Sequence, residues 1–166
     1  DYCSLDDILD YAAQRGEKPL IVIADGIEDP QNLGALIRTA ECAGAHGVII
    51  PKRRSVGLTG AVAKASAGAI EHVRIARVTN LAAAVDALKE KGVWIYAAEA
   101  DGTPYTQTDL SGAVAIVLGS EGFGVSRLVR EKSDFILSIP MYGQVNSLNV
   151  SAAASVLVFE AARQHH

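Results

Sequence analysis

The sequence predicts an α/β domain with a mostly parallel sheet that is covered by helices on both faces. Aliphatic runs of strand length alternate with helix-length segments along the chain, which is typical of parallel sheets. Two runs, residues 20–24 (LIVIA) and 113–118 (AVAIVL), are continuously apolar, as expected of strands buried on both faces. The chain has 166 residues, of which 49% are hydrophobic and only 5% aromatic, enough for one domain with an aliphatic core.

The individual elements follow from apolar runs and from start signals. The predicted strands are residues 20–24, 47–50, 73–78, 93–97, 113–118 and 135–139. Ser4 and Asp7 form a capping-box pattern, Asp29 precedes a proline in a first helical turn, and Asn80 is a typical N-cap. The predicted helices are residues 5–14, 30–44, 59–67, 80–91, 126–132 and 150–164, and residues 101–104 are predicted to form a turn.

The last predicted helix has almost no polar face. Apart from Ser151, Ser155, Glu160 and Arg163, residues 150–163 are alanine, valine, leucine or phenylalanine. A helix that is apolar nearly all round is a buried helix. We therefore expect the rest of the chain or a second subunit to cover it.

Composition excludes several classes of protein. No apolar run reaches the ~18 residues of a membrane span, and the acidic start, residues 1–7, does not resemble a signal peptide. Cys3 and Cys42 have no metal-ligand spacing, so we expect no metal and no disulfide framework, and a cytoplasmic protein. His165 and His166 resemble a tag remnant and are excluded from any site. Without linkers or repeats, residues 1–166 are predicted to form a single domain.

The charge distribution leaves two interpretations open. The net charge of −4 is unusual for a compact RNA-binding domain, which is often basic. The positive charge is nevertheless clustered, because Lys52, Arg53 and Arg54 are consecutive. This run is either a solvated turn or a patch that contacts phosphates.

The glycine-rich loop at residues 119–124 (GSEGFG) follows a predicted buried strand. It is not a P-loop, because Val125 stands where that motif has lysine, and its glycine spacing is the reverse of the dinucleotide fingerprint. The loop is either a structural turn or a ligand loop, and Glu121 favours the second interpretation.

Two other segments offer polar groups at the start of a helix. Asn32, Gly34 and Arg38 place an amide and a guanidinium in the helix after the 25–32 loop, where anions are favoured, although Arg38 could equally be a surface residue. Residues 146–149 (NSLN) occupy a strand-to-helix turn, a common ligand position in open α/β sheets. His46 and His72 are isolated and form no catalytic constellation.

Three blocks together carry a family resemblance. They are residues 25–40 (DGIEDPQNLGALIRTA), 116–122 (IVLGSEG) and 139–151, which begins IPM and ends NSLNVS. In this order and spacing they resemble the three signature motifs of the SpoU (TrmH-type) RNA ribose 2′-O-methyltransferases of the SPOUT superfamily. Residues 51–81 are similar to the branch that methylates a guanosine of 23S ribosomal RNA.

The resemblance implies a SPOUT-type α/β fold with a C-terminal trefoil knot, S-adenosylmethionine as cofactor and an obligate homodimer acting on RNA. It implies catalytic roles for Asn32, Arg38, Glu121, Ser147 and Asn149. It implies cofactor contacts from Leu118, Gly119, Ile139, Met141, Ser147 and Leu148, and RNA contacts from Arg38, Lys52, Arg53 and Arg54. The N-terminal RNA-binding domain usual in that branch has no counterpart here. Ribosomal RNA is the expected substrate, with a tRNA methyltransferase or a non-catalytic RNA-binding module as the alternatives.

Overall fold

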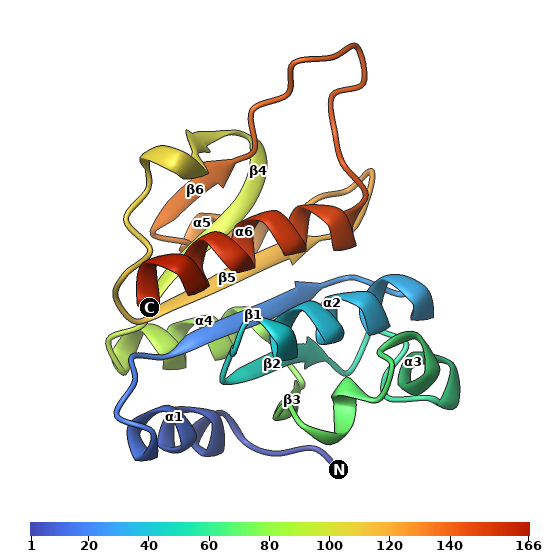
Figure 1. Ribbon diagram of the computed structural model, residues 1–166, viewed down its shortest axis with the longest axis vertical. Coiled ribbons are helices and arrows are strands. Elements are labelled where there is room, and N and C mark those ends of the chain that lie inside the picture. Colours follow the sequence, from blue (N-terminus) through green and yellow to red (C-terminus); the bar gives the residue numbers. More distant parts are fainter.

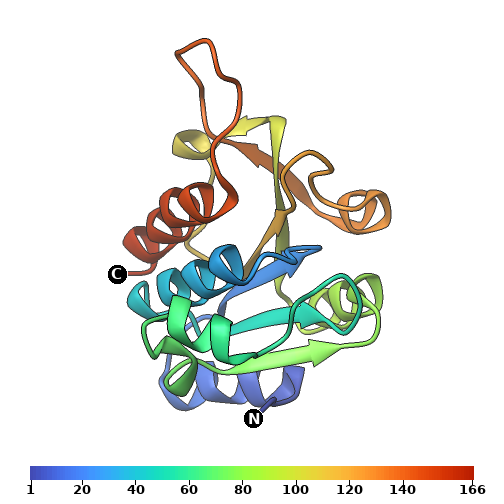
Figure 2. The same cartoon turned by 90° about the vertical axis from the view of Figure 1, so that its right-hand side faces the viewer.

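The computed structural model describes all 166 residues as a six-stranded sheet with helices on both faces (Figures 1 and 2). The strands are β1 Leu20–Asp25, β2 Gly47–Pro51, β3 Ile75–Val78, β4 Trp94–Pro104, β5 Val114–Gly119 and β6 Phe135–Ser138. Their order across the sheet is β3-β2-β1-β5-β4-β6, and every neighbouring pair is parallel. The predicted fold class is therefore confirmed, whereas the knot stays a prediction.

The helices begin within one residue of the predicted positions. They are α1 Leu5–Gln14, α2 Pro30–Cys42, α3 Gly60–Ala65, α4 Leu81–Glu90, α5 Arg127–Lys132 and α6 Val150–His165, with short 3-10 helices at Ala69–Glu71 and Tyr105–Gln107. Ser4 and Asp7 form both hydrogen bonds of the predicted capping box. Asp29 caps α2 by accepting from the Gln31 N–H, and Asn80 caps α4.

The two faces of the sheet have separate apolar cores. On one face, α2 and α6 pack side by side and contribute Leu36 and Leu157. On the other face, α4 and α5 contribute Val85 and Val129, and Ile8 of α1 joins them. Burial on both faces explains why the central strands are continuously apolar.

Strand β4 differs from the prediction. The sequence indicated a strand that stops at residue 97, followed by a turn at 101–104, but β4 continues to Pro104. Leu137 of β6 pairs with both Ala98 and Thr103, so residues 99–102 leave the ladder as a bulge. The predicted turn at 101–104 is therefore wrong: these residues belong to β4, and Thr103 and Pro104 pair with Leu137 and Ser138 of β6. This bulge borders the candidate site described below.

Helix α6 is only partly covered by its own chain. Leu157 and Ala154 are buried against the sheet and α2, and the Ser155 hydroxyl lies 3.1 Å from that of Thr39 in α2. Ala152, Ser155 and Phe159 form an exposed stripe one to two turns apart, and Phe159 is 46% exposed. The expectation that something covers the whole helix is thus met on one face.

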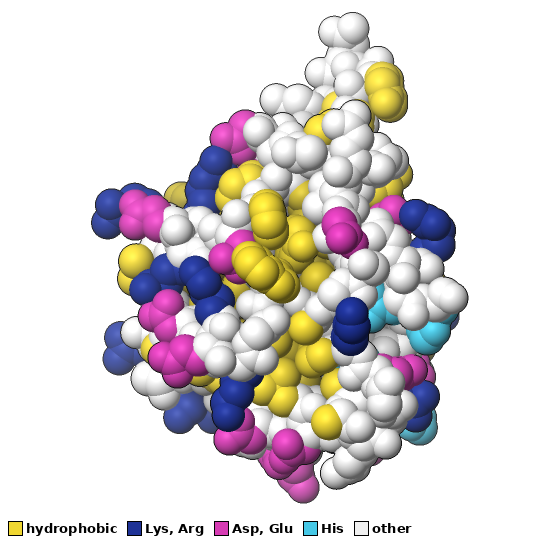
Figure 3. All heavy atoms as spheres, turned by 90° about the vertical axis from the view of Figure 1, so that its left-hand side faces the viewer, with side chains coloured by type: hydrophobic (Ala, Val, Ile, Leu, Met, Phe, Trp, Pro, Cys, Tyr) yellow, Lys and Arg dark blue, Asp and Glu magenta, His cyan; other side chains and the backbone are white.

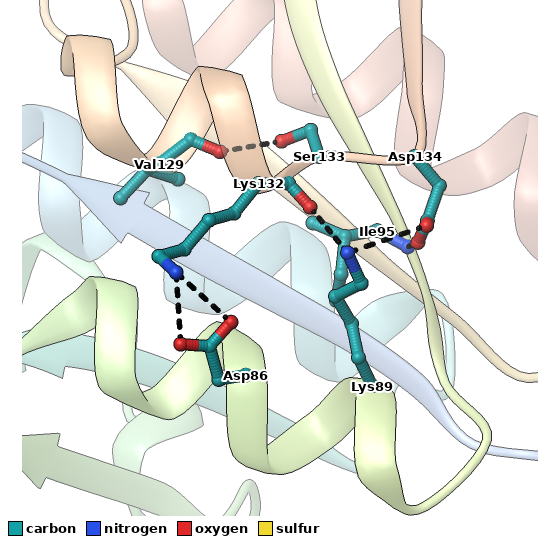
Figure 4. Close-up of polar contacts among 7 residues, drawn as sticks. All are labelled: Asp86, Lys89, Ile95, Val129, Lys132, Ser133 and Asp134. Carbon is teal, nitrogen blue, oxygen red and sulfur yellow. Dashed lines mark hydrogen bonds and ion pairs between the residues drawn. The ribbon is translucent and has the colours of Figure 1, made fainter.

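A set of ion pairs and hydrogen bonds fixes α5 to α4 and to the beginning of β4 and β6 (Figure 4). Lys132 pairs with Asp86 at 2.9 Å, and the Lys89 ammonium donates to the Lys132 carbonyl. Asp134 accepts from the Ile95 N–H at 2.8 Å. These contacts join two helices and two strands, so α5 has a defined position against the sheet.

The end of the sheet where the strands begin carries exposed rings. The side chains of Trp94 and Phe135 are about half exposed, and Phe135 stacks on Tyr96 with ring centroids 5.0 Å apart. Figure 3 views this side of the molecule, where hydrophobic side chains gather between charged ones. No helix of the structure has both the length and the apolar character that crossing a membrane requires.

Candidate active site

The three polar loops predicted from the sequence meet at the end of the sheet where the strands stop, which faces the viewer in Figure 2. Asp25 and Gly119 are register partners at the ends of β1 and β5. The loop after β6 extends away from the body before it returns to α6 (Figure 1). Because all strands are parallel, loops distant in the sequence converge at this edge, which is where ligands bind in open α/β sheets.

Asn149 joins the three loops. As the N-cap of α6, its Oδ1 accepts from the Ser151 N–H at 2.9 Å. Its Nδ2 donates to Asn32 Oδ1 at 3.1 Å and to Glu121 Oε1 at 3.0 Å. One amide therefore uses its oxygen to begin a helix and its nitrogen to hold the two other loops together.

Glu121 lies at the N-terminus of α6. Its Oε1 accepts from the Val150 N–H at 3.3 Å as well as from Asn149. A carboxylate is favoured there because the N-terminal amides of a helix carry partial positive charge. The side chain of Glu121 remains exposed, so it is accessible from the cavity that it borders.

A cavity of about 650 Å³ lies between these loops and the β4 bulge. Its lining includes every residue for which a cofactor contact was predicted, namely Leu118, Gly119, Ile139, Met141, Ser147 and Leu148. Ala98, Glu99 and Ala100 of β4 form another part of the wall. Phe123, which is 91% exposed, stands beside it on the glycine-rich loop.

The glycine-rich loop folds back closely on its own start. A Cβ on Gly119 would lie 2.1 Å from the carbonyl carbon of Gly124, and the Gly124 N–H donates to the Ser120 carbonyl at 2.8 Å. Gly124 itself has a φ of +69°. The loop conformation thus depends on glycine at both positions, which was the structural alternative at the sequence level.

The predicted RNA-binding cations are not part of this cluster. Arg38 is exposed on α2, six residues after Asn32, and makes no hydrogen bond or ion pair within the chain. Lys52 and Arg53 are exposed and also unpaired. Arg54 differs, because its Nη2 lies 3.7 Å from Oδ1 of the buried Asp25.

A protein-family model supplies the assignment. Residues 19–159 match the model of the SpoU rRNA Methylase family. The chain belongs to this family. Membership confirms the resemblance to the SpoU family and places the chain among RNA methyltransferases that use S-adenosylmethionine. The likeness to the 23S ribosomal RNA branch stays a prediction.

Relatives of this SpoU-family chain agree with the assignment. YacO of Bacillus subtilis (strain 168), assigned to the TrmH family of tRNA/rRNA methyltransferases, is 48% identical over all of this chain and 67% of its own length. The SpoU methyltransferase AviRb from Streptomyces viridochromogenes, solved with the cofactor AdoMet (S-adenosylmethionine), is 27% identical at a TM-score of 0.83, over 89% of this chain and 61% of its own. The A. aeolicus TrmH/SpoU tRNA modifying enzyme is 28% identical at a TM-score of 0.80, and the match covers 95% of this chain and 84% of that enzyme's chain. This chain thus spans about three fifths of AviRb.

The cavity of the SpoU-family chain suits S-adenosylmethionine. Its volume is in the range of small-molecule sites, roughly 300–1,000 Å³. Leu118, Ile139 and Leu148 give it apolar walls. The exposed carboxylate of Glu121 suits a ligand that carries ammonium and sulfonium charges.

Two groups at the site were not found from the sequence. Oδ2 of Asp25 accepts from the Ser126 N–H at 2.7 Å and so connects the end of β1 to the beginning of α5. Glu99 pairs with Arg130, which also binds Asp101 and thereby lowers the pKa of the Asp101 carboxyl. Asp25 directly ends an apolar run, which was an available signal. No sequence signal indicated Glu99, because its strand was predicted to end at residue 97.

Proposed function

We propose that the chain is the catalytic domain of a cytoplasmic enzyme that transfers a methyl group from S-adenosylmethionine to a ribose 2′-hydroxyl of RNA. The observation that carries the proposal is the contact of Asn32, Glu121 and Asn149 at a cavity lined by the second and third motif loops. Three residues with catalytic roles implied by the resemblance are thus hydrogen-bonded neighbours, although 117 positions separate Asn149 from Asn32.

The cofactor site consists largely of main chain and apolar side chains. Gly119 and Ile139 would present backbone groups to the adenosine part, and Leu118, Met141 and Leu148 would enclose it. Ser147 adds a hydroxyl to the lining. When bound, S-adenosylmethionine supplies an activated methyl group, so the chain itself must orient the ribose hydroxyl and favour loss of its proton.

Arg38 would act on the RNA and not as a base. A guanidinium with a pKa above ~12 rarely gives up its proton. Its exposure and lack of a partner leave it free to hold a phosphate next to the target ribose and to stabilise a developing alkoxide. Asn32, Glu121, Ser147 and Asn149 would shape the site around the nucleotide.

Lys52 and Arg53 would contact further phosphates, because both are exposed and unpaired. Arg54 is also exposed, but its contact with Asp25 gives it a second role, which is to hold residues 52–54 (the basic loop) near the end of β1. We therefore expect the contribution of Arg54 to RNA binding to be smaller than that of its two neighbours.

We also propose that two chains associate through the exposed stripe of α6. The stripe of Ala152, Ser155 and Phe159 is small, largely apolar and adjacent to α2. A second copy that covers it would complete the burial predicted for this helix. Arg38 lies on α2, whose Thr39 contacts Ser155 of α6, so association would bring it close to the partner subunit.

The expected substrate is ribosomal RNA, with a guanosine of 23S ribosomal RNA as the target. A tRNA target is the second candidate, because one relative of similar fold is a tRNA modifying enzyme. A non-catalytic RNA-binding module is a third, and the joined Asn32, Glu121 and Asn149 side chains disfavour it.

Transfer of tritiated methyl groups from S-adenosylmethionine tests these alternatives. Incorporation into undermethylated ribosomal RNA but not tRNA, mapped to one ribose, would support the leading proposal. Incorporation into tRNA alone would support the second. RNA binding without any incorporation, by a protein that does bind S-adenosylmethionine, would contradict catalysis.

A further inference from the structure

Glu99 is a carboxylate in the cavity wall with one oxygen unused. Its Oε1 accepts from Arg130 Nη1 at 3.2 Å, while its Oε2 makes no hydrogen bond within the chain. The side chain is only 19% exposed and belongs to the cavity lining. The chain gives this oxygen no donor, so a ligand in the cavity can supply one.

The position of Glu99 is set from two sides. The β4 bulge takes residues 99–102 out of the ladder, and Glu99 lines the cavity from this bulge. Arg130 holds the carboxylate from α5, and Asp101 holds Arg130 at 2.7 Å. Helix α5 is itself fixed by the ion pairs of Lys132 and Asp86 (Figure 4).

The glycine-rich loop leaves room for the free oxygen. A Cβ on Gly124 would lie 2.7 Å from Oε2 of Glu99, so any larger residue would press on the carboxylate. Gly124 therefore serves both the turn and the space in front of Glu99. Two segments, 99–102 and 119–124, thus together leave one hydrogen-bond acceptor, Oε2 of Glu99, available to a ligand.

We propose that Glu99 binds a ribose hydroxyl of the adenosyl cofactor through Oε2 and that Arg130 positions it. The inference rests on the proposed function, in which the adenosine lies between the ends of β5 and β6. Strand β4 lies between these two strands in the sheet, so Glu99, at the bulge of β4, is next to the place proposed for the adenosine. A carboxylate is well suited to this task, because a ribose diol offers donors and a carboxylate only accepts.

Calorimetric titration with S-adenosylhomocysteine tests the inference. Glu99→Gln should lower the affinity by about tenfold or more, as expected for a lost hydrogen bond to a charged group. Glu131→Gln is the matched control, since it removes the charge of another carboxylate that pairs with an arginine of α5, Arg127, but is exposed and does not line the cavity. Its affinity should stay within about threefold of wild type.

Analogues identify the group that Glu99 binds. Two analogues of S-adenosylhomocysteine lack either the 2′- or the 3′-hydroxyl. The analogue that lacks the hydroxyl bound by Glu99 should bind the wild-type protein more weakly than S-adenosylhomocysteine does, and Glu99→Gln should not weaken its binding further. Methylthioadenosine, which lacks the amino-acid part, should still distinguish the variant from wild type. Arg130→Met should weaken binding in wild type but add little in the Glu99→Gln background.

The outcomes separate the two levels of the proposal. Wild-type binding with an unchanged Glu99→Gln variant would overturn the Glu99 inference alone, as would an equal loss for all analogues. The comparison of analogues on wild type needs no variant and stays decisive if Glu99→Gln does not fold. No binding of S-adenosylhomocysteine by wild type would overturn the proposed function and this inference with it.

Discussion

Two regions meet near Asn149, the cofactor cavity and the surface that carries the exposed cations, and they differ in how their side chains are held. On the cavity side, both acidic side chains are held by other residues of the chain: Glu121 by Asn149, and Glu99 by Arg130. On the other side, Arg38 and Lys52 are exposed and have no partner in the chain. The cavity side has its shape before any ligand binds, whereas the cationic side acquires partners only from RNA or a second subunit.

This difference separates two kinds of binding energy. A preformed site loses little conformational freedom when its ligand binds, so its affinity depends on shape and hydrogen bonds. Exposed cations gain most of their binding free energy by releasing counterions from RNA, so their contribution depends on salt. Variants on the two sides should therefore change different measurements.

The largest effect is expected from Arg38→Ala. Methyl transfer should fall by roughly 100- to 1,000-fold, because the variant loses the cation that would stabilise the developing charge. The affinity for S-adenosylmethionine, measured by calorimetry, should stay near wild type because Arg38 does not line the cavity. Loss of cofactor affinity in this variant would contradict the prediction and would make Arg38 part of the cofactor site.

Gly119→Ala should affect the cavity side next. The new Cβ would meet Gly124 at 2.1 Å, so the loop must shift. Overpacking of this kind should weaken S-adenosylhomocysteine binding by about 10- to 100-fold. Gly112→Ala is the control, because its Cβ would have no neighbour within 4 Å and its affinity should not change.

Phe159→Lys should weaken association of two chains. Placing a charge on the large apolar residue of the α6 stripe should raise the dimer dissociation constant by about tenfold or more, measured by light scattering over a dilution series. Phe135→Lys is the matched control, since Phe135 is 47% exposed, nearly the same as Phe159, but lies at the end of the sheet where the strands begin. Equal behaviour of both variants would reject the stripe as the interface.

The smallest expected effect concerns the basic loop. Removing Lys52 and Arg53 together should flatten the dependence of RNA affinity on salt by roughly 1.4 in logarithmic slope, for two phosphate contacts to single-stranded RNA. Arg54→Ala should instead lower thermal stability, because it leaves the buried carboxylate of Asp25 without its cation. An unchanged slope in the double variant would reject the patch.

The fold could be predicted well because its signals are local. Continuous apolar runs, the Ser4 and Asp29 caps and the glycine-rich loop each determine their own segment. Glu99 could not be predicted, because its orientation depends on how β4 pairs with β6 around a bulge. The pairing of Arg54 with Asp25 is likewise a contact between distant segments, which the run of three cations does not indicate.

The most direct test is a calorimetric titration of S-adenosylmethionine into the wild-type protein between about 50 and 200 mM salt, beside RNA binding under the same conditions. The account predicts one cofactor per chain with an affinity that changes little with salt, while RNA affinity falls steeply. Absence of cofactor binding, or cofactor affinity that falls with salt as steeply as RNA affinity does, would contradict it.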